Sequence, residues 1–173
     1  MMNACVFLDR DGVINKDNPN YTFRKEDFDI LPGVIEALGL LKTKGYLLVV
    51  VTNQSGISQG LYTREQMESC HQFFQRQSGN VIDHFYFSPD HPTVTASLSR
   101  KPGTLMFEKA IARFSIDIKK SWMIGDRGRD IIPARKMGIR TIQVGDEIDE
   151  KEKADHRVDD LREAAAIILS DSQ

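Results

Sequence analysis

Aspartates that follow short apolar runs are the residues best suited to chemistry in this sequence. Asp9 and Asp11 lie two positions apart directly after the apolar run 4–8, and Asp126 and Asp130 follow a later apolar run. Carboxylate oxygens are hard ligands of the kind that Mg²⁺ takes in proteins, and a carboxylate can also act as a nucleophile or transfer a proton. Taken alone, the first pair is equally well explained as two solvated turn aspartates.

Groups suited to hold an anion follow two further predicted strand ends. They carry hydroxyl, amide or cationic side chains and comprise Thr52, Asn53, Gln54, Ser55, Arg100 and Lys101. Side chains and backbone N–H groups at such turns can bind an anion, and a cation just before a helix adds fixed positive charge. Each feature alone fits an ordinary turn or a surface lysine. Together with the aspartates they occupy four strand ends, which chance would rarely produce.

Apolar runs alternate with segments of helical periodicity along the chain. The pattern predicts strands at 4–8, 46–52, 82–87, 121–124 and 141–144, with a short edge strand near 157–158. It predicts helices at 32–44, 63–77, 103–114, 130–137 and 160–169. Pro32 fits the first turn of its helix, Gly45 fits the end of that helix, and Thr63 with Gln66 fits a capping box. This alternation predicts an α/β fold, with a doubly wound parallel sheet covered on both faces.

Three stretches interrupt the alternation, at 15–31, 55–62 and 88–102, and each follows a predicted strand or its turn. Ligands of open α/β sheets bind beyond the carboxyl ends of the strands, so these loops lie where a site is expected. Neither the stretch at 15–31 nor the one before Lys101 is long enough for a folded cap domain. We therefore expect an open site that only loops cover.

Length, composition and charge set further bounds. The chain has 173 residues, of which 40% are hydrophobic and 28% charged, and this fits one domain spanning 1–173. A net charge of −2 disfavours a nucleic-acid binder. The apolar runs are far shorter than the ~20 residues of a membrane span, and the N-terminus lacks a secretory pattern, so we expect a cytoplasmic protein without membrane attachment. We also expect a monomer in which Cys5 and Cys70 are buried free thiols.

Four motifs resemble those of the haloacid dehalogenase (HAD) superfamily of phosphatases in order and spacing. They are Asp-Arg-Asp-Gly-Val-Ile-Asn at 9–15, Thr-Asn-Gln-Ser-Gly at 52–56, Arg-Lys-Pro at 100–102 and Gly-Asp-Arg-Gly-Arg-Asp at 125–130. The most similar subgroup contains the heptose-bisphosphate and histidinol-phosphate phosphatases, and the similarity covers nearly the whole chain. The resemblance implies a three-layer Rossmann-like fold and a Mg²⁺-dependent phosphomonoesterase that works through an aspartyl-phosphate.

The resemblance also implies roles for the aspartates. Asp9 would be the nucleophile, and Asp11 the general acid and base. Asp9 and Asp126 would bind Mg²⁺ through their side chains, and Asp11 through its backbone carbonyl. To act as an acid near neutrality, Asp11 must have its pKa raised, an effect that Asp9 favours and Mg²⁺ opposes. Asp130 would hydrogen bond to Lys101 or to metal-bound water, or would simply stabilise a helix N-terminus.

The remaining motif residues would bind phosphate or substrate. Thr52 and the N–H of Asn53 would hold equatorial oxygens, and Lys101 would pair with both the phosphate and the nucleophile. Arg100 could grip the same phosphate or a second one. The amide and hydroxyl that follow Asn53 complete this predicted set.

Two departures from the subgroup bear on the ligand. The loop at 88–92 resembles the segment where heptose-bisphosphate phosphatases carry a zinc site of histidine and cysteines, but Ser88 and Ser99 stand near the expected thiol positions. His91 alone cannot form the four-ligand site that structural zinc prefers, so zinc is not expected. Gln59 stands where the sugar-bisphosphate branch has a basic residue, which removes a charge that a second phosphate would use.

Several substrates remain open. The leading hypothesis is hydrolysis of the 7-phosphate of D-glycero-D-manno-heptose 1,7-bisphosphate, and the alternative is histidinol phosphate. Extra basic charge such as Arg100 or Arg129 favours a second phosphate, whereas an acidic pocket favours the amine of histidinol. A polynucleotide 3′-phosphatase is disfavoured by the net charge, and a non-catalytic phospho-ligand binder by the intact Asp9 and Asp11.

Overall fold

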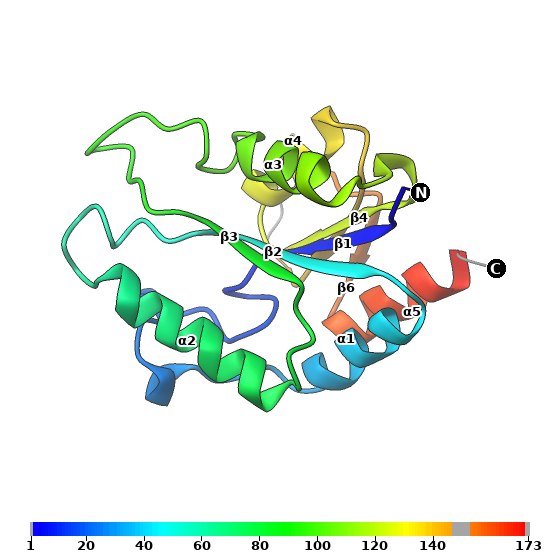
Figure 1. The fold of residues 1–173 in the computed structure, drawn as a ribbon, viewed down its shortest axis with the longest axis horizontal. Helices are drawn as coiled ribbons and strands as arrows, with labels where there is room; N and C mark the ends of the chain where they lie inside the picture. The colour runs from blue at the N-terminus through cyan, green and yellow to red at the C-terminus, as the bar shows by residue number, and fades with distance from the viewer. Residues whose placement is uncertain (1, 147–152, 172–173) are drawn as a thin grey trace.

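One parallel sheet forms the centre of the structure, a computed structural model that describes residues 2–146 and 153–171. Its strands within these residues are β1 (Cys5–Leu8), β2 (Leu47–Asn53), β3 (His84–Ser88), β4 (Trp122–Gly125), β5 (Arg140–Val144) and β6 (His156–Val158). They lie in the order β3-β2-β1-β4-β5-β6 (Figure 1). The chain moves outward from β1 first in one direction and then in the other, so the prediction of a doubly wound parallel sheet is confirmed.

Helices cover both faces of this sheet and complete three layers (Figure 1). One face packs against α1 (Val34–Thr43), α2 (Arg64–Gln77) and α5 (Leu161–Asp171). The other face packs against α3 (Leu105–Phe114) and α4 (Gly128–Lys136). Two three-residue 3₁₀ helices, η1 (Lys25–Asp27) and η2 (Ile118–Lys120), lie in the connections. None of the described helices is long and apolar enough to span a lipid bilayer.

The strand β1 illustrates why apolar runs form the central strands. Val6 and Leu8 belong to the core cluster that includes the inner faces of α1 and α5, whereas Cys5 and Phe7 belong to the cluster beneath α3 and α4. All four side chains are fully buried. A parallel strand covered on both faces must be apolar at successive positions, and this gives the unbroken run seen in the sequence. Cys5 and Cys70 are buried free thiols, as predicted.

The ends of α1 and α2 test the predicted helix signals. The placement of Pro32 in the first turn of α1 is wrong, because Gly33 adopts φ of 75° and the chain turns before the helix begins at Val34. Gly45, with φ of 89°, follows the end of α1 as predicted. The capping box of α2 is confirmed: the Thr63 hydroxyl accepts the N–H of Gln66, and the Gln66 side chain accepts the N–H of Thr63.

Loops, and no folded cap domain within the described residues, border the carboxyl ends of the strands. The 16–29 loop is closed at its base by an antiparallel bridge between Asn15 and Ile30, and η1 is its one helical segment. Arg10 holds this loop in place through a hydrogen bond from its Nη2 to the carbonyl of Thr22 at 2.8 Å. The connection at 89–104 contains no helix or strand. The expectation of an uncapped sheet bordered by loops is therefore confirmed.

Candidate active site

The predicted site residues meet beyond the carboxyl ends of the central strands. Asp9 follows the last residue of β1, Asp126 follows the last residue of β4, and Thr52 and Asn53 close β2. The N–H of Asp9 donates to the carbonyl of Ile124 at 3.0 Å, which joins the ends of β1 and β4. The strand order reverses between these two strands, and crevices at such reversals are the usual ligand sites of open α/β sheets.

Lys101 is a buried cation between two carboxylates. Its side chain is fully buried, and its Nζ lies 2.9 Å from Oδ1 of Asp9 and 2.6 Å from Oδ1 of Asp130. The same ammonium group donates to the carbonyl of Val51 at 2.6 Å. Burial lowers the pKa of Lys101, but the two carboxylates outweigh it and hold the pKa above its ordinary value. Lys101 is therefore a fixed positive charge in contact with the predicted nucleophile.

Asn53 fixes the backbone of Lys101. Its Oδ1 accepts the N–H of Lys101 at 2.9 Å, and its Nδ2 donates to the carbonyl of Lys101 at 3.0 Å. This clamp holds a loop residue against the end of β2, although the two residues are 48 positions apart. The sequence predicts that the Asn53 backbone contacts a phosphate. It does not predict that the Asn53 side chain binds the backbone of Lys101.

Three carboxylates converge beside Lys101, because Asp9, Asp126 and Asp130 each place an oxygen within 4.8 Å of the others. Burial and the charge of Asp130 raise the pKa of Asp9 to about 6, against the effect of Lys101. Burial and the charges of Asp9 and Asp130 raise the pKa of Asp126 to about 8. Among the described residues, the buried Oδ1 of Asp126 has no hydrogen-bond partner. An unpartnered carboxylate oxygen among like charges fits a divalent cation that takes oxygen ligands.

Asp130 fulfils both of the roles that the sequence leaves open. Its Oδ1 pairs with Lys101, and its Oδ2 accepts the N–H of Arg127 at 3.1 Å. The second bond caps α4 from its third residue, so the helix begins at Gly128 rather than at the predicted residue 130. Gly125 permits this close approach, because a Cβ at that position would lie 2.3 Å from the Cβ of Asp130.

Asp11 is held by three side chains. Arg10 donates to it through Nε at 3.2 Å and Nη2 at 2.9 Å, Asn15 donates at 2.9 Å, and Gln54 donates at 3.0 Å. Burial raises the pKa of Asp11, but Arg10 and these hydrogen bonds outweigh it and hold the pKa below its ordinary value. The expectation of a raised pKa is wrong for this conformation, because the sequence does not show that the buried Arg10 guanidinium turns toward Asp11 rather than Asp9.

Gln54 joins Asp11 to the rest of the second motif. Its Nε2 donates to Oδ2 of Asp11 at 3.0 Å and to Oγ1 of Thr52 at 2.9 Å, and its Oε1 accepts the hydroxyl of Tyr62 at 2.8 Å. Gln54 and Ser55 are both buried. Thr52 accepts a hydrogen bond here, which leaves its hydroxyl proton for another acceptor. Tyr62 is absent from the predicted set, and no motif spacing points to it.

Arg100 and Arg129 add positive charge near the cluster. Arg100 is partly buried, and its Nη1 donates to the carbonyl of Asp90 at 3.1 Å. Burial and the neighbouring charge of Arg129 both lower the pKa of Arg100, so the two guanidinium groups are close enough to repel each other. Within the described residues, the buried Nε of Arg129 has no hydrogen-bond partner.

The loop that resembles a zinc-binding segment contains a network of hydroxyl groups. Oγ of Ser99 lies 2.9 Å from Oγ of Ser88 and 2.8 Å from Oγ of Ser97. Nδ1 of His91 lies 2.7 Å from Oγ1 of Thr93. Hydrogen bonds thus connect the two ends of this loop, and the expectation that zinc is not bound remains a prediction.

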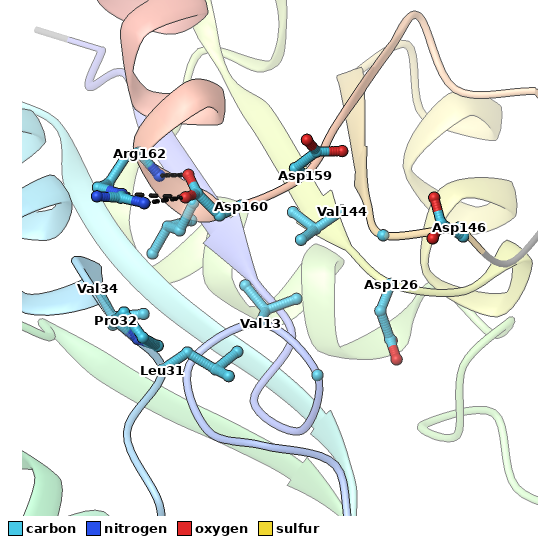
Figure 2. A pocket seen from close by; sticks show the side chains of 13 residues that line it. Val13, Leu31, Pro32, Val34, Asp126, Val144, Asp146, Asp159, Asp160 and Arg162 are labelled. Carbon is cyan, nitrogen blue, oxygen red and sulfur yellow. Dashed lines mark hydrogen bonds and ion pairs between the residues drawn. The ribbon is translucent and has the colours of Figure 1, made fainter.

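A cleft of about 430 Å³ adjoins Asp126 on the side of α1 and α5 (Figure 2). Apolar side chains line much of it, namely Val13, Leu31, Pro32, Val34, Val144 and Leu161. Acidic residues surround them: Asp126, Asp146, Asp159 and Asp160. Arg162 also borders the cleft, but it pairs with Asp160 at 2.6 Å. The cleft therefore combines apolar contact surface with hydrogen-bond acceptors beside the carboxylate cluster.

Three comparisons relate the chain to known proteins. Residues 98–167 match the family model described as HAD-hydrolase-like. The chain is 37% identical over 150 residues to D-glycero-beta-D-manno-heptose-1,7-bisphosphate 7-phosphatase of Haemophilus ducreyi, with 82% of each chain covered. It is also 37% identical over 150 residues to the D-glycero-alpha-D-manno enzyme of Burkholderia mallei, covering 82% of this chain and 79% of that one. The solved structure of D,D-heptose 1,7-bisphosphate phosphatase from B. bronchiseptica, complexed with magnesium and phosphate, is similar with a TM-score of 0.87 at 26% identity, covering 97% of this chain and 99% of that chain.

Proposed function

Because the chain belongs to the family of HAD-like phosphatases that includes the heptose-1,7-bisphosphate 7-phosphatases, we propose that it hydrolyses the 7-phosphate of D-glycero-D-manno-heptose 1,7-bisphosphate. The observation that carries this proposal is the buried contact between Lys101 and Asp9 inside a cluster of carboxylates at the ends of β1 and β4. A phosphate ester is an anion, so a carboxylate nucleophile needs such neutralising charge to approach it.

Asp9 and Asp126 would hold Mg²⁺ together with the backbone carbonyl of Asp11. The unpartnered Oδ1 of Asp126 and the raised pKa values of Asp9 and Asp126 support this assignment. When bound, the cation would supply positive charge that offsets the repulsion among the carboxylates and the incoming phosphate. Asp130 is less suited to bind the cation, since Lys101 and the N–H of Arg127 already engage its two oxygens.

Asp9 would attack phosphorus in line and form an aspartyl-phosphate, which splits one difficult displacement into two easier ones. Its Oδ1 is fixed by Lys101 at 2.9 Å and by the N–H of Arg10 at 2.8 Å, so the carboxylate has a defined orientation before substrate arrives. Thr52 would donate its hydroxyl proton to a phosphate oxygen. The backbone N–H of Asn53 would bind a second oxygen while its side chain keeps Lys101 in position.

Asp11 would protonate the leaving alcohol and then accept a proton from the attacking water. Arg10 favours the charged form of Asp11, which suits the second of these steps. The negative charge of a bound phosphate acts in the opposite direction and favours the protonated form that the first step needs.

The second phosphate of the substrate would meet Arg100 and Arg129. Burial and the charge of Arg129 lower the pKa of Arg100, and an anion between the two guanidinium groups would offset both effects. The chain is equally similar over 150 residues to an enzyme for the beta anomer and to one for the alpha anomer. The proposal therefore covers heptose 1,7-bisphosphate without a choice of anomer.

Histidinol phosphate is the second candidate, and the cleft beside Asp126 is the observation that favours it. Asp146 and Asp159 border this cleft as well, and carboxylates would bind the ammonium group of histidinol. The same carboxylates would also accept hydrogen bonds from sugar hydroxyls, so the cleft alone does not exclude the leading substrate.

Phosphate release from a substrate panel tests the proposal. The panel contains both anomers of the heptose bisphosphate, fructose 1,6-bisphosphate, histidinol phosphate and a 3′-phosphorylated oligonucleotide, each with Mg²⁺ and with a chelator. We expect Mg²⁺-dependent release of the 7-phosphate from a heptose bisphosphate at a kcat/KM well above that of the other compounds. Preference for histidinol phosphate or the oligonucleotide would reject the assigned substrate, and turnover undiminished by the chelator would reject the role of Mg²⁺.

A further inference from the structure

We propose that Gln54 is a positioning residue for Asp11 and that Tyr62 sets the orientation of Gln54. The proposal rests on the proposed function, in which Asp11 transfers a proton to the leaving group. It gives Gln54 a different duty from the phosphate contact that the sequence motif suggests.

The hydrogen bonds of Gln54 leave its amide little freedom. Both protons of Nε2 have acceptors, Oδ2 of Asp11 at 3.0 Å and Oγ1 of Thr52 at 2.9 Å. The hydroxyl of Tyr62 donates to Oε1 at 2.8 Å. Exchange of the amide oxygen and nitrogen would place an oxygen against the carboxylate of Asp11, so the network itself defines the orientation. With both protons in use, Gln54 is poorly placed to donate to a phosphate.

Packing fixes Tyr62 and so fixes the far end of this chain of hydrogen bonds. Its ring stacks on Phe23 at a centroid distance of 5.1 Å with 4° between the planes, and it lies 5.6 Å from the ring of Tyr21. On another side the ring presses on Gly56, where an added Cβ would lie 2.2 Å from Cε1 of Tyr62. The tyrosine is only 4% exposed. Its hydroxyl is therefore a fixed donor for Gln54.

The consequence for Asp11 concerns one oxygen in particular. Arg10 donates to both oxygens, Asn15 donates to Oδ1, and Gln54 donates to Oδ2. Gln54 also links Oδ2 to the hydroxyl of Thr52. Gln54 thus sets the distance between the group that transfers the proton and a group expected to hold the phosphate. Proton transfer is sensitive to such placement, because the donor must lie within hydrogen-bond reach of the leaving oxygen.

Leaving groups of different basicity test this duty. An alkyl phosphate such as the heptose bisphosphate leaves as a basic alkoxide and needs a proton, whereas 4-nitrophenyl phosphate leaves as a stable phenolate and needs little help. For Gln54→Met, which keeps the shape and removes the hydrogen bonds, we expect kcat/KM with the alkyl substrate to fall roughly 10- to 100-fold, because kcat/KM reports formation of the aspartyl-phosphate and not its later attack by water. We expect kcat/KM with 4-nitrophenyl phosphate to fall less than about threefold.

Two further variants make the test specific. Tyr62→Phe should show a smaller loss with the same dependence on the leaving group, and the double variant should be no slower than Gln54→Met, since both act through one contact. Gln75→Met is the matched control: the Gln75 amide makes two hydrogen bonds, to the backbone of Ile82 at 2.7 Å and 3.1 Å, away from the site. Gln75→Met should lower the melting temperature, and any loss of kcat/KM should be the same with both substrates.

Each of the following results would overturn the proposal. Equal losses of kcat/KM with both substrates would mean that Gln54 supports the fold or binds the phosphate and does not position Asp11 for protonation of the leaving group. Asp11→Asn, measured in parallel, distinguishes failure of the role proposed for Gln54 from failure of the role proposed for Asp11. If Asp11→Asn shows the leaving-group dependence and Gln54→Met does not, positioning by Gln54 fails and the proposed function stands. If Asp11→Asn itself shows no dependence, the assigned role of Asp11 fails and the positioning proposal fails with it.

Discussion

Replacement of Asp126 by asparagine should stabilise the metal-free protein and abolish its response to Mg²⁺. In the folded protein, Asp126 shares a small volume with Asp9 and Asp130, and its Oδ1 is buried without a hydrogen-bond partner among the described residues. The asparagine side chain would occupy nearly the same space without a negative charge. The repulsion within the cluster would fall, and an essential part of the cation site would be lost at the same time.

The size of this stabilisation follows from the pKa of Asp126, which rises from 3.8 to about 8 on folding. Each unit of such a shift corresponds to about 1.4 kcal/mol, so at about pH 7 the unfavourable contribution of Asp126 approaches about 4 kcal/mol as an upper bound. A change of 1 kcal/mol moves the melting temperature of a chain of this size by roughly 2–4 °C. We therefore expect Asp126→Asn to raise the melting temperature of the metal-free protein, with an upper bound of roughly 8–16 °C.

The stability of the metal-free protein should fall as the pH rises. A carboxyl group whose pKa is raised on folding binds its proton more tightly in the folded state, so its favourable contribution is present at low pH and is lost as the pH rises through the folded-state value. For Asp9 that value is about 6 and for Asp126 about 8. The metal-free wild type should therefore lose stability between about pH 5 and about pH 8, while Asp126→Asn should lose less.

Thermal unfolding in EDTA and in Mg²⁺ across this pH range is the appropriate measurement. Mg²⁺ should stabilise the wild type more at about pH 8 than at about pH 6, and it should leave the variant unchanged. Asp159→Asn is the matched control, because Asp159 is an exposed carboxylate on the same cleft and lies outside the cluster. A metal-free variant less stable than wild type at about pH 8, or one still stabilised by Mg²⁺, would refute this account of the cluster.

Three other substitutions test neighbouring parts of the site. Asp9→Asn should lower kcat by roughly 10³-fold or more in a protein that remains folded, and turnover near the wild-type rate would reject Asp9 as the nucleophile. Lys101→Met should destabilise the protein by roughly 3–5 kcal/mol in denaturant titrations, because Asp9 and Asp130 would be buried without their cation; stability equal to wild type would contradict the salt-bridge geometry. Gly12→Ala should weaken Mg²⁺ affinity in calorimetric titration, since Gly12 has φ of 84° and an added Cβ would lie 2.4 Å from Oδ2 of Asp126; unaltered affinity would count against Asp126 as a ligand.

Periodicity was enough to predict the sheet and the helices, because continuous apolar runs leave few alternatives to buried parallel strands. The prediction that α1 begins at Pro32 was wrong. Gly33 adopts a left-handed backbone conformation, so the helix begins two residues later, at Val34. Periodicity also failed at the start of α4, where the contact between Asp130 and the N–H of Arg127 depends on the folded site. Helix ends of this kind are decided by tertiary contacts that a sequence pattern does not contain.

The site was predictable as a set of residues but not as a network. Motif order places Asp9 and Asp126 after neighbouring strands and Lys101 in a loop at the same edge of the sheet, and the structure brings these groups together. The direction of a long side chain is a different matter. Nothing in the spacing shows that Arg10 turns toward Asp11, or that Gln54 connects two motifs, because both depend on which buried polar partners remain after the chain has packed.

The clamp between Asn53 and Lys101 has a consequence for how this enzyme can diversify. Because Asn53 binds the main chain of Lys101, it grips the loop at 89–104 without regard to the side chains that the loop carries elsewhere. Substitutions, insertions or a change of ligand in that loop could therefore accumulate while the ammonium group of Lys101 stays against Asp9. Selection could in this way change which phosphorylated compound the enzyme binds while the contact between Lys101 and Asp9 is kept.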